Sequence, residues 1–274
     1  MLKRLTRSQE VNSDFLGFLA AHPNKNIIFI DIGCRGEPIE NWPTKRTGLA
    51  YIGIDADCLE VAKLNHSLLR YKGAIKASFF NTIVSNDGLP RTFARSDVGM
   101  TDRLIEASEA QSYVENGWRV SVERSETLEV IVERVLSQFS SKNSLVVLKI
   151  DVEGWSHDVI SNKVSLSRFS YVICEFLPNM PMQFKTMALL ESSDFEIADI
   201  ERAYKYDRRY GRKLFIIDTV WKAKSLNDGS ALSDKAPGVL YKIFSFAVFY
   251  VVRILLGSLN KKTHISISDA ELRW

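Results

Sequence analysis

The sequence has few cysteines and no clustered metal ligands. Its 274 residues include only three cysteines, Cys34, Cys58 and Cys174, which cannot all pair with one another. No C-x-x-C pair and no Cys/His cluster is present. These absences argue against a disulfide-stabilised scaffold and against a structural zinc site, and they favour a reducing compartment.

The chain also lacks a marked excess of charge of either sign. It carries 36 Lys and Arg against 33 Asp and Glu, which leaves a formal charge of +3. Such a balance gives no broad basic surface, so we expect no nucleic-acid partner. Hydrophobic residues make up 46% and charged residues 25% of the chain, as in ordinary globular proteins, which argues against a mainly disordered chain.

A convincing export signal is missing as well. Met1–Arg7 is basic, but the apolar stretch that follows is short and is interrupted by Asp14. We interpret Ser13–Ala21 as a short amphipathic helix in a lead-in over residues 1–25, and we expect a cytoplasmic protein.

Short apolar runs rich in β-branched residues follow one another along the chain. Such continuous runs suit strands buried on both faces, as in parallel sheets. The predicted strands are Asn26–Ile30, Leu49–Ile54, Ala77–Val84, Ser144–Ile150 and Arg168–Cys174. The predicted helices, from apolar spacing, are Leu59–Arg70, Leu128–Phe139, His157–Ser161 and Gln183–Glu191.

A long hairpin is predicted after these elements. Its strands are Phe195–Ile200 and Lys213–Val220, joined by the basic, tyrosine-rich stretch Arg202–Arg212. Strand–helix alternation followed by a hairpin predicts a doubly wound α/β domain, which we place at residues 26–222.

Carboxylates stand at the ends of four predicted strands. They are Asp31, Asp55, Asp151 and Glu175. Open α/β sheets bind ligands in the crevice beyond the carboxyl ends of their strands. Four acidic residues at equivalent places therefore predict an acidic, polar binding rim.

The turn after the first strand, Asp31–Gly36, carries two glycines, which allow a ligand to approach the backbone closely. Asp55 follows at the end of the second strand, where a carboxylate can accept hydrogen bonds from both ribose hydroxyls of an adenosine ligand. Asp31 stands where a dinucleotide-binding turn would have glycine. A carboxylate would repel a pyrophosphate and attract an amino group or a sulfonium, which favours S-adenosylmethionine over NAD.

Several of these segments resemble the FkbM family of S-adenosylmethionine-dependent methyltransferases. The most specific match is Lys149–Gly154, which reads K-I-D-V-E-G, and the resemblance covers about Ile27–Trp221. It implies a Rossmann-like methyltransferase sheet and O-methylation of a sugar, glycan or natural-product hydroxyl. The cofactor-binding residues that it implies are Asp31, Gly33, Cys34, Arg35, Gly36, Asp55 and Ala56. Glu37, where a second glycine is expected, and Trp155–His157, in place of an acidic residue, depart from the family pattern.

Asp151 and Glu153 are the candidate catalytic residues. We expect Asp151 near the methyl donor and Glu153 as base or acceptor ligand, although Glu153 equally suits a cap for the helix that follows. These carboxylates suit a divalent cation, but their spacing does not require one.

Three further residues are candidates for the acceptor side. His157 is either a substrate contact or base, or a packing residue. Glu175 either lines the acceptor pocket or is a solvated strand end. Arg208, in the basic link of the hairpin, suits an anionic or glycan substrate, or is simply solvated.

The last part of the chain is apolar. Residues 223–238 read as a linker to a helix and tail over 239–274. Lys242 and Arg253 return to nearly the same helical face, which is typical of a helix lying in a membrane interface, with contact over 239–262. The ten uncharged residues between them make roughly 15 Å of helix, about half of what spans a bilayer. Packing on the domain or on a partner subunit is the alternative.

Two other functions remain open at this stage. One is a nicotinamide-dependent oxidoreductase on the same kind of sheet. The other is a non-catalytic Rossmann-like binding module that is anchored by its C-terminal helix.

Overall fold

A computed structural model describes nine segments of the chain. Two compact units are separated near residue 228, and the second, Gly229–Trp274, lies wholly outside these segments. The predicted helices at Ser13–Ala21 and 239–274 also fall outside them. The described segments are 25–34, 48–67, 75–96, 102–139, 144–152, 155–160, 166–176, 181–207 and 212–226.

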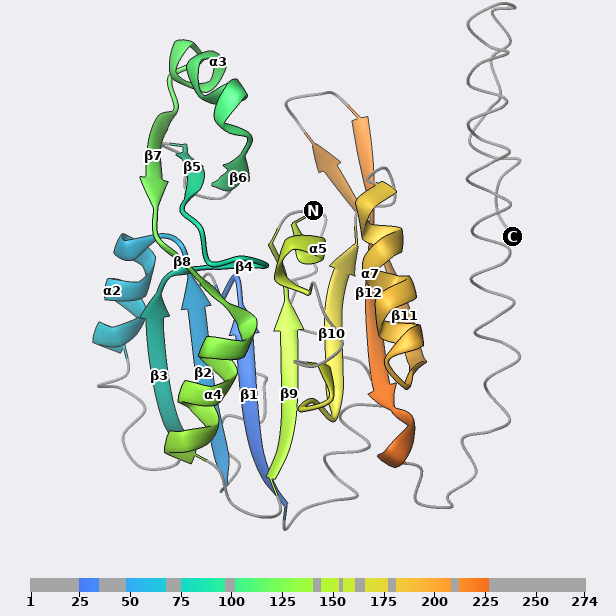
Figure 1. The fold of residues 1–274 in the computed structure, drawn as a ribbon. Coiled ribbons are helices and arrows are strands. Elements are labelled where there is room, and N and C mark those ends of the chain that lie inside the picture. The colour runs from blue at the N-terminus through green and yellow to red at the C-terminus, as the bar shows by residue number, and fades with distance from the viewer. Residues whose placement is uncertain are drawn as a thin grey trace, which may run out of the picture. The chain divides into compact units, whose positions relative to one another are not determined.

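A seven-stranded sheet forms the centre of the described unit, in the order β3-β2-β1-β9-β10-β12-β11 (Figure 1). The pairs among β3, β2, β1, β9 and β10 are parallel, whereas β12 runs antiparallel to β10 and β11. The mixed α/β fold with a central parallel sheet is thereby confirmed. The bounds are β1 Asn26–Ile32, β2 Leu49–Asp55, β3 Ile75–Asn81, β9 Ser144–Ile150, β10 Tyr171–Phe176, β11 Phe195–Asp207 and β12 Arg212–Ala223.

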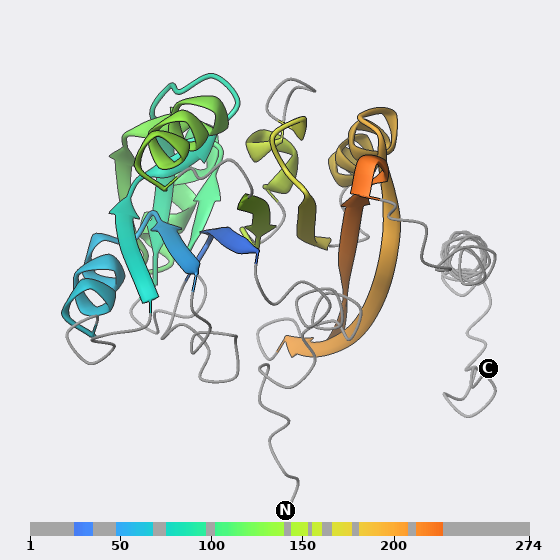
Figure 2. The same ribbon diagram turned by 90° about the horizontal axis from the view of Figure 1, so that it is seen from below.

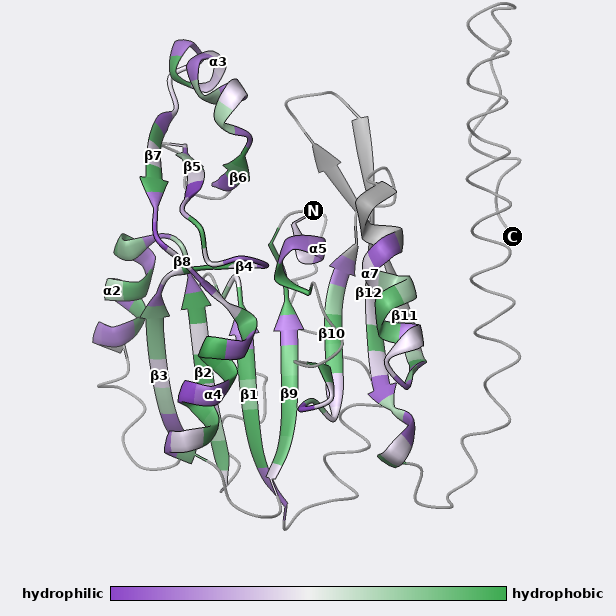
Figure 3. Cartoon of the chain, viewed as in Figure 1, coloured by the Kyte–Doolittle hydropathy of each residue, from purple (hydrophilic) through white to green (hydrophobic). Residues whose placement is uncertain are grey.

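The central strands are buried along almost their whole length. Every residue of β1 from Ile27 to Ile32 is buried, and β2 is buried up to its last residue. Figure 3 shows the same strands as predominantly hydrophobic. Burial on both faces explains why these segments read as continuous apolar runs rather than as alternating ones.

Helices cover both faces of the sheet (Figures 1 and 2). On one face, Val61 of α2 belongs to a buried cluster with Phe79 of β3. On the other, Arg134 of α4 lies over the ring of Phe80. Consecutive residues of a strand point to opposite faces, so α2 and α4 lie on opposite sides. The bounds of the α-helices are α2 Cys58–Ser67, α3 Ala110–Glu115, α4 Leu128–Phe139, α5 Ser156–Val159 and α7 Pro181–Ser192, and those of the 3₁₀ turns are η3 Ala107–Glu109 and η4 Lys224–Leu226.

Two small sheets, which the sequence pattern did not predict, lie between β3 and α4 in the chain. One is the parallel pair β4 and β8, and the other has the order β6-β5-β7. Arg91 of β5 joins the second sheet to α5, because its Nε and Nη2 lie 3.1 and 3.3 Å from the carboxylate of the buried Asp158. The bounds are β4 Ile83–Ser85, β5 Arg91–Arg95, β6 Arg103–Ile105, β7 Arg119–Glu123 and β8 Ser125–Thr127.

Several predicted boundaries were wrong. The single strand predicted over Ala77–Val84 is interrupted at Thr82, after which β4 leaves the central sheet. The strand predicted from Arg168 begins at Tyr171, since Phe169 still closes a turn by donating to the Leu166 carbonyl at 3.0 Å. Most of the predicted link after Ile200 belongs to β11, which pairs with β12 as far as Asp207. Helix α4 has the predicted bounds.

Among the described residues, no helix is long and apolar enough to cross a membrane.

The chain order across the sheet reverses between β1 and β9. From β1 the chain proceeds through β2 to β3 on one side, and from β9 it proceeds to β10 on the other. Backbone hydrogen bonds join the strand ends here: Gly33 donates to the Ile54 carbonyl at 2.8 Å, and Asp151 donates to the Ile32 carbonyl at 2.9 Å. Such a reversal point is where doubly wound sheets bind ligands.

Gly33 is required at this reversal point for two reasons. Its φ is +84°, a conformation that residues with a side chain rarely adopt. A Cβ at this position would also lie 2.0 Å from the Asp151 carbonyl oxygen, which is backbone and cannot rotate away. Gly117 has a similar φ of +81°, but nothing lies within 4 Å of its Cβ position.

We therefore expect Gly33→Ala to destabilise the protein far more than Gly117→Ala. The Gly117 variant suffers only the left-handed backbone strain, about 1–2 kcal/mol. The Gly33 variant adds a steric clash, for a total of roughly 3–5 kcal/mol. Urea unfolding of both variants measures the difference, and equal losses would contradict the close approach of Gly33 to Asp151.

Candidate functional site

Asp31 and Lys149 form an ion pair between the two central strands. The two residues lie opposite each other in the β1–β9 pair, and Lys149 Nζ donates to Asp31 Oδ1 at 2.9 Å. The Tyr51 hydroxyl donates to Asp31 Oδ2 at 2.6 Å. Asp151 Oδ2 lies 3.8 Å from the same Lys149 nitrogen. Two carboxylates around one ammonium leave this group with a formal charge of −1.

The ionisation of this group follows from its burial. Burial alone would lower the pKa of Lys149, but the charges of Asp31 and Asp151 outweigh burial and raise that pKa above its ordinary value. Burial, followed by the charge of Asp31, raises the pKa of Tyr51 well above its ordinary value. Lys149 therefore stays charged and Tyr51 stays neutral over the physiological range.

Cys34 is buried in the same core cluster as Tyr51. Its Sγ would lie 2.7 Å from a Cβ on Gly53 of the neighbouring strand. Burial is the largest cause that raises the pKa of the Cys34 thiol, and the charges of Asp31 and Asp55 raise it further. The thiol therefore stays protonated and unreactive, so the backbone of Cys34, rather than its sulfur, is what remains to contact a ligand.

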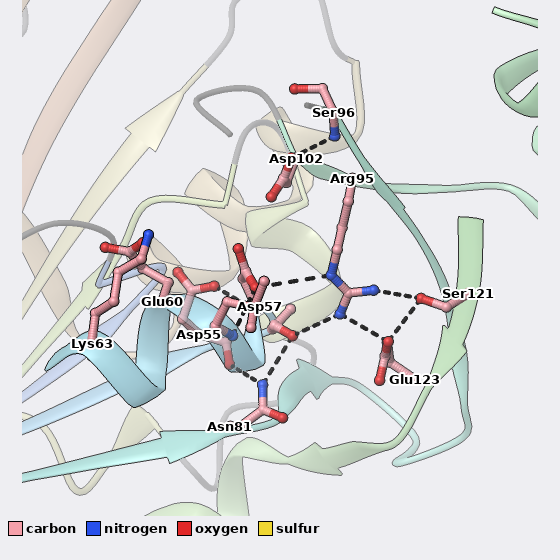
Figure 4. A network of polar contacts seen from close by, with 12 residues as sticks. Asp55, Asp57, Glu60, Lys63, Asn81, Arg95, Ser96, Asp102, Ser121 and Glu123 are labelled. Carbon is pink, nitrogen blue, oxygen red and sulfur yellow. Dashed lines mark hydrogen bonds and ion pairs between the residues drawn. The ribbon is translucent and has the colours of Figure 1, made fainter. Parts of the chain in front are cut away.

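Asp55 ends β2 in a turn that is held by hydrogen bonds (Figure 4). Its Oδ1 accepts from the backbone N–H of Asp57 at 2.8 Å. Asn81, the last residue of β3, donates its side-chain amide to the carbonyls of Asp55 and Ala56 at 3.1 and 2.9 Å. Asp57 in turn accepts from the backbone of Leu59 at 3.0 Å and so caps α2. One hydrogen bond thus holds the Asp55 carboxylate itself, and two from Asn81 hold the backbone beside it.

A cavity of about 500 Å³ lies beside this turn, and Asn81 lines it. This volume is within the range of sites that bind small molecules and cofactors. Phe80 and Pro90 contribute apolar surface, and Ser125 and Glu126 contribute polar groups. Asn81 is thus shared by the cavity and the Asp55 turn, although Asp55 itself does not line the cavity.

Two other predicted residues lie near the end of β10 and in α5. Glu175, next to the end of β10, is buried, at 9% exposure. His157, in α5, is half-buried, and its ring stacks on that of Trp155 with centroids 5.8 Å apart. Within the described segments His157 Nδ1 is buried without a hydrogen-bond partner.

The structure brings Asp31 and Asp151 together through Lys149, and it brings Gly33 and Cys34 onto the end of β2 by hydrogen bonds to Ile54. Four predicted site residues lie outside the described residues, and their roles stay predictions. These are Arg35, Gly36, Glu153 and Arg208.

Sequence reasoning missed four residues that shape the site: Tyr51, Asn81, Arg95 and Lys149. Lys149 carried a usable signal, because a lysine inside an otherwise apolar strand needs a buried partner. Asn81 gave no such signal, because the strand was predicted to continue to Val84, and only the structure ends β3 at Asn81. No local signal pointed to Tyr51 or Arg95, whose partners are distant in sequence.

Within the part of the chain that the structure describes, no group of three or more His, Cys, Asp and Glu residues is placed to hold a metal ion.

Comparisons with known proteins give only distant likenesses. No family model matches the chain, and no curated protein is similar to it in sequence. The FkbM resemblance therefore stays a prediction. Solved structures of similar fold include the magnesium protoporphyrin IX methyltransferase of Synechocystis PCC 6803 with bound S-adenosylmethionine, at 13% identity and a TM-score of 0.39, covering 77% of this chain and 76% of that one.

Two further solved structures are similar at the same level. A putative RNA methyltransferase from Pyrococcus horikoshii has 9% identity and a TM-score of 0.39, covering 78% of this chain and 80% of that one. A putative tRNA methyltransferase from Streptococcus pneumoniae has 13% identity and a TM-score of 0.38, covering 95% and 92%. Likeness at this level assigns no activity to the chain, so its function has to be argued from the residues of the site.

The buried thiol of Cys34 makes stability depend on alkaline pH. Above pH ~8.5 an unfolded cysteine loses its proton, whereas folded Cys34 keeps it, so stability falls as pH rises. Between pH 8.5 and 10 this residue removes roughly 1.5 kcal/mol from the free energy of unfolding. We expect the free energy of unfolding of Cys34→Ala to fall by roughly 1.5 kcal/mol less than that of wild type between pH 8.5 and 10. Urea unfolding measured across this pH range checks the difference.

The exposed Cys58 supplies the matched control. Cys58→Ala should keep the wild-type decline with pH. If Cys34→Ala and wild type decline in parallel, the thiol is not protected as described.

Proposed function

We propose that the chain is an S-adenosylmethionine-dependent methyltransferase that methylates a hydroxyl oxygen of a sugar, glycan or natural product. One observation carries the proposal. Asp55, Asp31 and Asp151 stand at or next to the carboxyl ends of three adjacent strands, β2, β1 and β9, at the point where the chain order reverses. Doubly wound sheets bind nucleotide-type ligands at that place.

The chemistry of these residues fits the cofactor. The turn that holds the Asp55 carboxylate suits two ribose hydroxyls, and the adjoining cavity has room for a base. The group formed by Asp31, Lys149 and Asp151 has a formal charge of −1, which favours the amino group and the sulfonium of S-adenosylmethionine. When bound, this cofactor supplies a methyl group that is already activated for displacement.

Lys149 compensates the charge of Asp31. Asp31 pairs with Lys149 and is only 7% exposed, so it does not meet a ligand as an isolated charge. The negative charge left over is that of Asp151, whose side chain is 25% exposed and therefore accessible. Preference for a cation over a pyrophosphate thus rests on Asp151 more than on Asp31.

For the transfer itself, the protein has to align the acceptor and remove a proton. We assign Asp151 to the donor side and Glu153, two residues further on, to the acceptor hydroxyl, whose proton a carboxylate accepts. Alignment of two reactants is worth about 7–11 kcal/mol of the barrier in well-oriented reactions. Lys149 contributes by holding Asp151 beside β1.

The acceptor side is proposed from neighbouring residues. The stacked rings of Trp155 and His157 offer a flat apolar surface of the kind that packs against sugar rings. Glu175 and Arg208 are the proposed polar contacts of the acceptor. A divalent metal is accommodated by this chemistry but not required.

We also propose a cytoplasmic protein in which residues 239–262 contact the inner face of a membrane. A lipid-linked glycan would then be a natural acceptor. Liposome flotation of the chain with and without residues 239–274 tests this contact, and equal partitioning of the two would contradict it.

Cofactor binding is measured by calorimetry with S-adenosylhomocysteine and, for comparison, NADH. We expect wild type to bind S-adenosylhomocysteine and Asp55→Asn to bind it roughly tenfold or more weakly, because an amide presents one acceptor atom where the carboxylate presents two. Asp194→Asn, at an exposed residue whose positive φ of 62° asparagine tolerates, should bind as wild type does. Binding of NADH alone would overturn the proposal.

Methyl transfer is measured with labelled S-adenosylmethionine and a glycan extract. We expect transfer by wild type and by Asp194→Asn, and a loss of roughly 100-fold or more in Asp151→Asn, because the methyl donor is then less well aligned. Tight cofactor binding without transfer to any acceptor would instead support the non-catalytic module.

A further inference from the structure

Arg95 reaches from the small sheet β6-β5-β7 to the turn that follows β2. It is the last residue of β5, and its side chain is 15% exposed. Its Nη2 lies 3.5 Å from the Ala56 carbonyl oxygen, and its Nε lies 3.9 Å from Asp57 Oδ1 (Figure 4). Through Arg95, the small sheet contacts the same turn that orients Asp55.

The guanidinium of Arg95 is held in place by its own sheet. Nη1 donates to Ser121 Oγ at 2.6 Å, and Nη2 donates to Glu123 Oε1 at 2.9 Å. Ser121 also donates to Glu123 at 2.8 Å, and the ring of Phe93 lies 4.9 Å from the guanidinium carbon. Three groups on two strands, Ser121 and Glu123 of β7 and Phe93 of β5, therefore set the direction in which Arg95 points.

Glu123 keeps its charge in this arrangement. Burial alone would raise its pKa, but the hydrogen bonds from Ser121 and Arg95 and the positive charge of Arg95 lower it. Arg95 thus has one close carboxylate on its own sheet and a second, that of Asp57, on the turn, and it bridges the two.

The contact of Arg95 with the turn leads directly to Asp55. Arg95 contacts Ala56 and Asp57, and the backbone N–H of Asp57 is the donor that holds Asp55 Oδ1. Asn81 fixes the two carbonyls on the other side of the turn. A shift of Asp57 would therefore weaken the hydrogen bond that orients the Asp55 carboxylate.

We propose that Arg95 is a positioning residue for the ribose contact, so that the small sheet β6-β5-β7 is part of the cofactor site. This inference rests on the proposed function, in which Asp55 accepts hydrogen bonds from both ribose hydroxyls. Two simultaneous hydrogen bonds need one fixed orientation of the carboxylate, and Arg95 maintains it by holding Ala56 and Asp57. Arg95 itself does not touch the cofactor.

The test compares two ligands, S-adenosylhomocysteine and its 2′,3′-dideoxy analogue, by calorimetry on the full chain. Wild type should bind the analogue roughly tenfold more weakly, because both hydroxyls are missing. Arg95→Gln should lose roughly tenfold in affinity for S-adenosylhomocysteine and little for the analogue, so that the preference for the hydroxyls nearly disappears. Arg103→Gln, on β6 of the same sheet beside Trp118, should keep the wild-type preference.

The outcomes separate the two proposals. If wild type does not bind S-adenosylhomocysteine, the proposed function itself fails. If wild type binds it and Arg95→Gln either binds both ligands unchanged or loses the same factor for both, Arg95 does not position Asp55 and the inference is overturned.

A milder variant is available if Arg95→Gln does not fold. Ser121→Ala leaves the charges in place and removes only one of the groups that aim the guanidinium. Ser121→Ala should lose less affinity than Arg95→Gln does, and it should lose it only for S-adenosylhomocysteine and not for the dideoxy analogue. An unchanged preference in a folded Ser121→Ala variant would then overturn the inference.

Discussion

The ion pair between Lys149 and Asp31 joins the two strands on which the candidate site depends. It lies where the chain order of the sheet reverses, and it brings a third charged group, Asp151, to the same place. A lysine in a largely apolar strand is stable as a cation only if carboxylates surround it, and Asp31 and Asp151 supply them. The pair therefore sets both the local stability of the strand ends and the charge that a ligand meets.

The arrangement of the strand ends leaves little freedom around this pair. Gly33 passes so close to the Asp151 carbonyl that no side chain fits there, and the neighbouring amides bond to the end of β2. Tyr51 occupies the second oxygen of Asp31. A site that is rigid before its ligand arrives loses less entropy on binding, which suits the alignment that the proposed methyl transfer needs.

The carboxyl end of β2 depends on residues from three separate parts of the chain. Asn81 comes from the end of β3, Arg95 from the small sheet, and Asp57 from the turn itself. The small sheet is an insertion between β3 and α4, yet two arginines attach it to the rest of the fold, Arg91 to α5 and Arg95 to the turn. These two polar contacts therefore hold the small sheet near the carboxyl ends of the central strands.

The sequence by itself determined the central strands and helix α4. Ile27–Ile30 and Leu145–Leu148 are apolar without interruption because both faces are buried, and Leu128–Phe139 repeats with helical spacing because one face packs on the sheet. Strand ends that carry Asp31, Asp55 and Asp151 also followed from local patterns. The small strands near β5 gave no such pattern, because they are short and only partly buried.

Only the tertiary structure decided which charges meet. Lys149 and Asp31 are 118 positions apart, and their contact depends on β9 lying beside β1 in one register. Arg95 reaches Ala56 from 39 positions away, across two different sheets. The periodicity of a segment predicts whether it is buried, but it does not predict which segments lie beside it. The charge of the site depends on strand order and register, which only the tertiary structure defines.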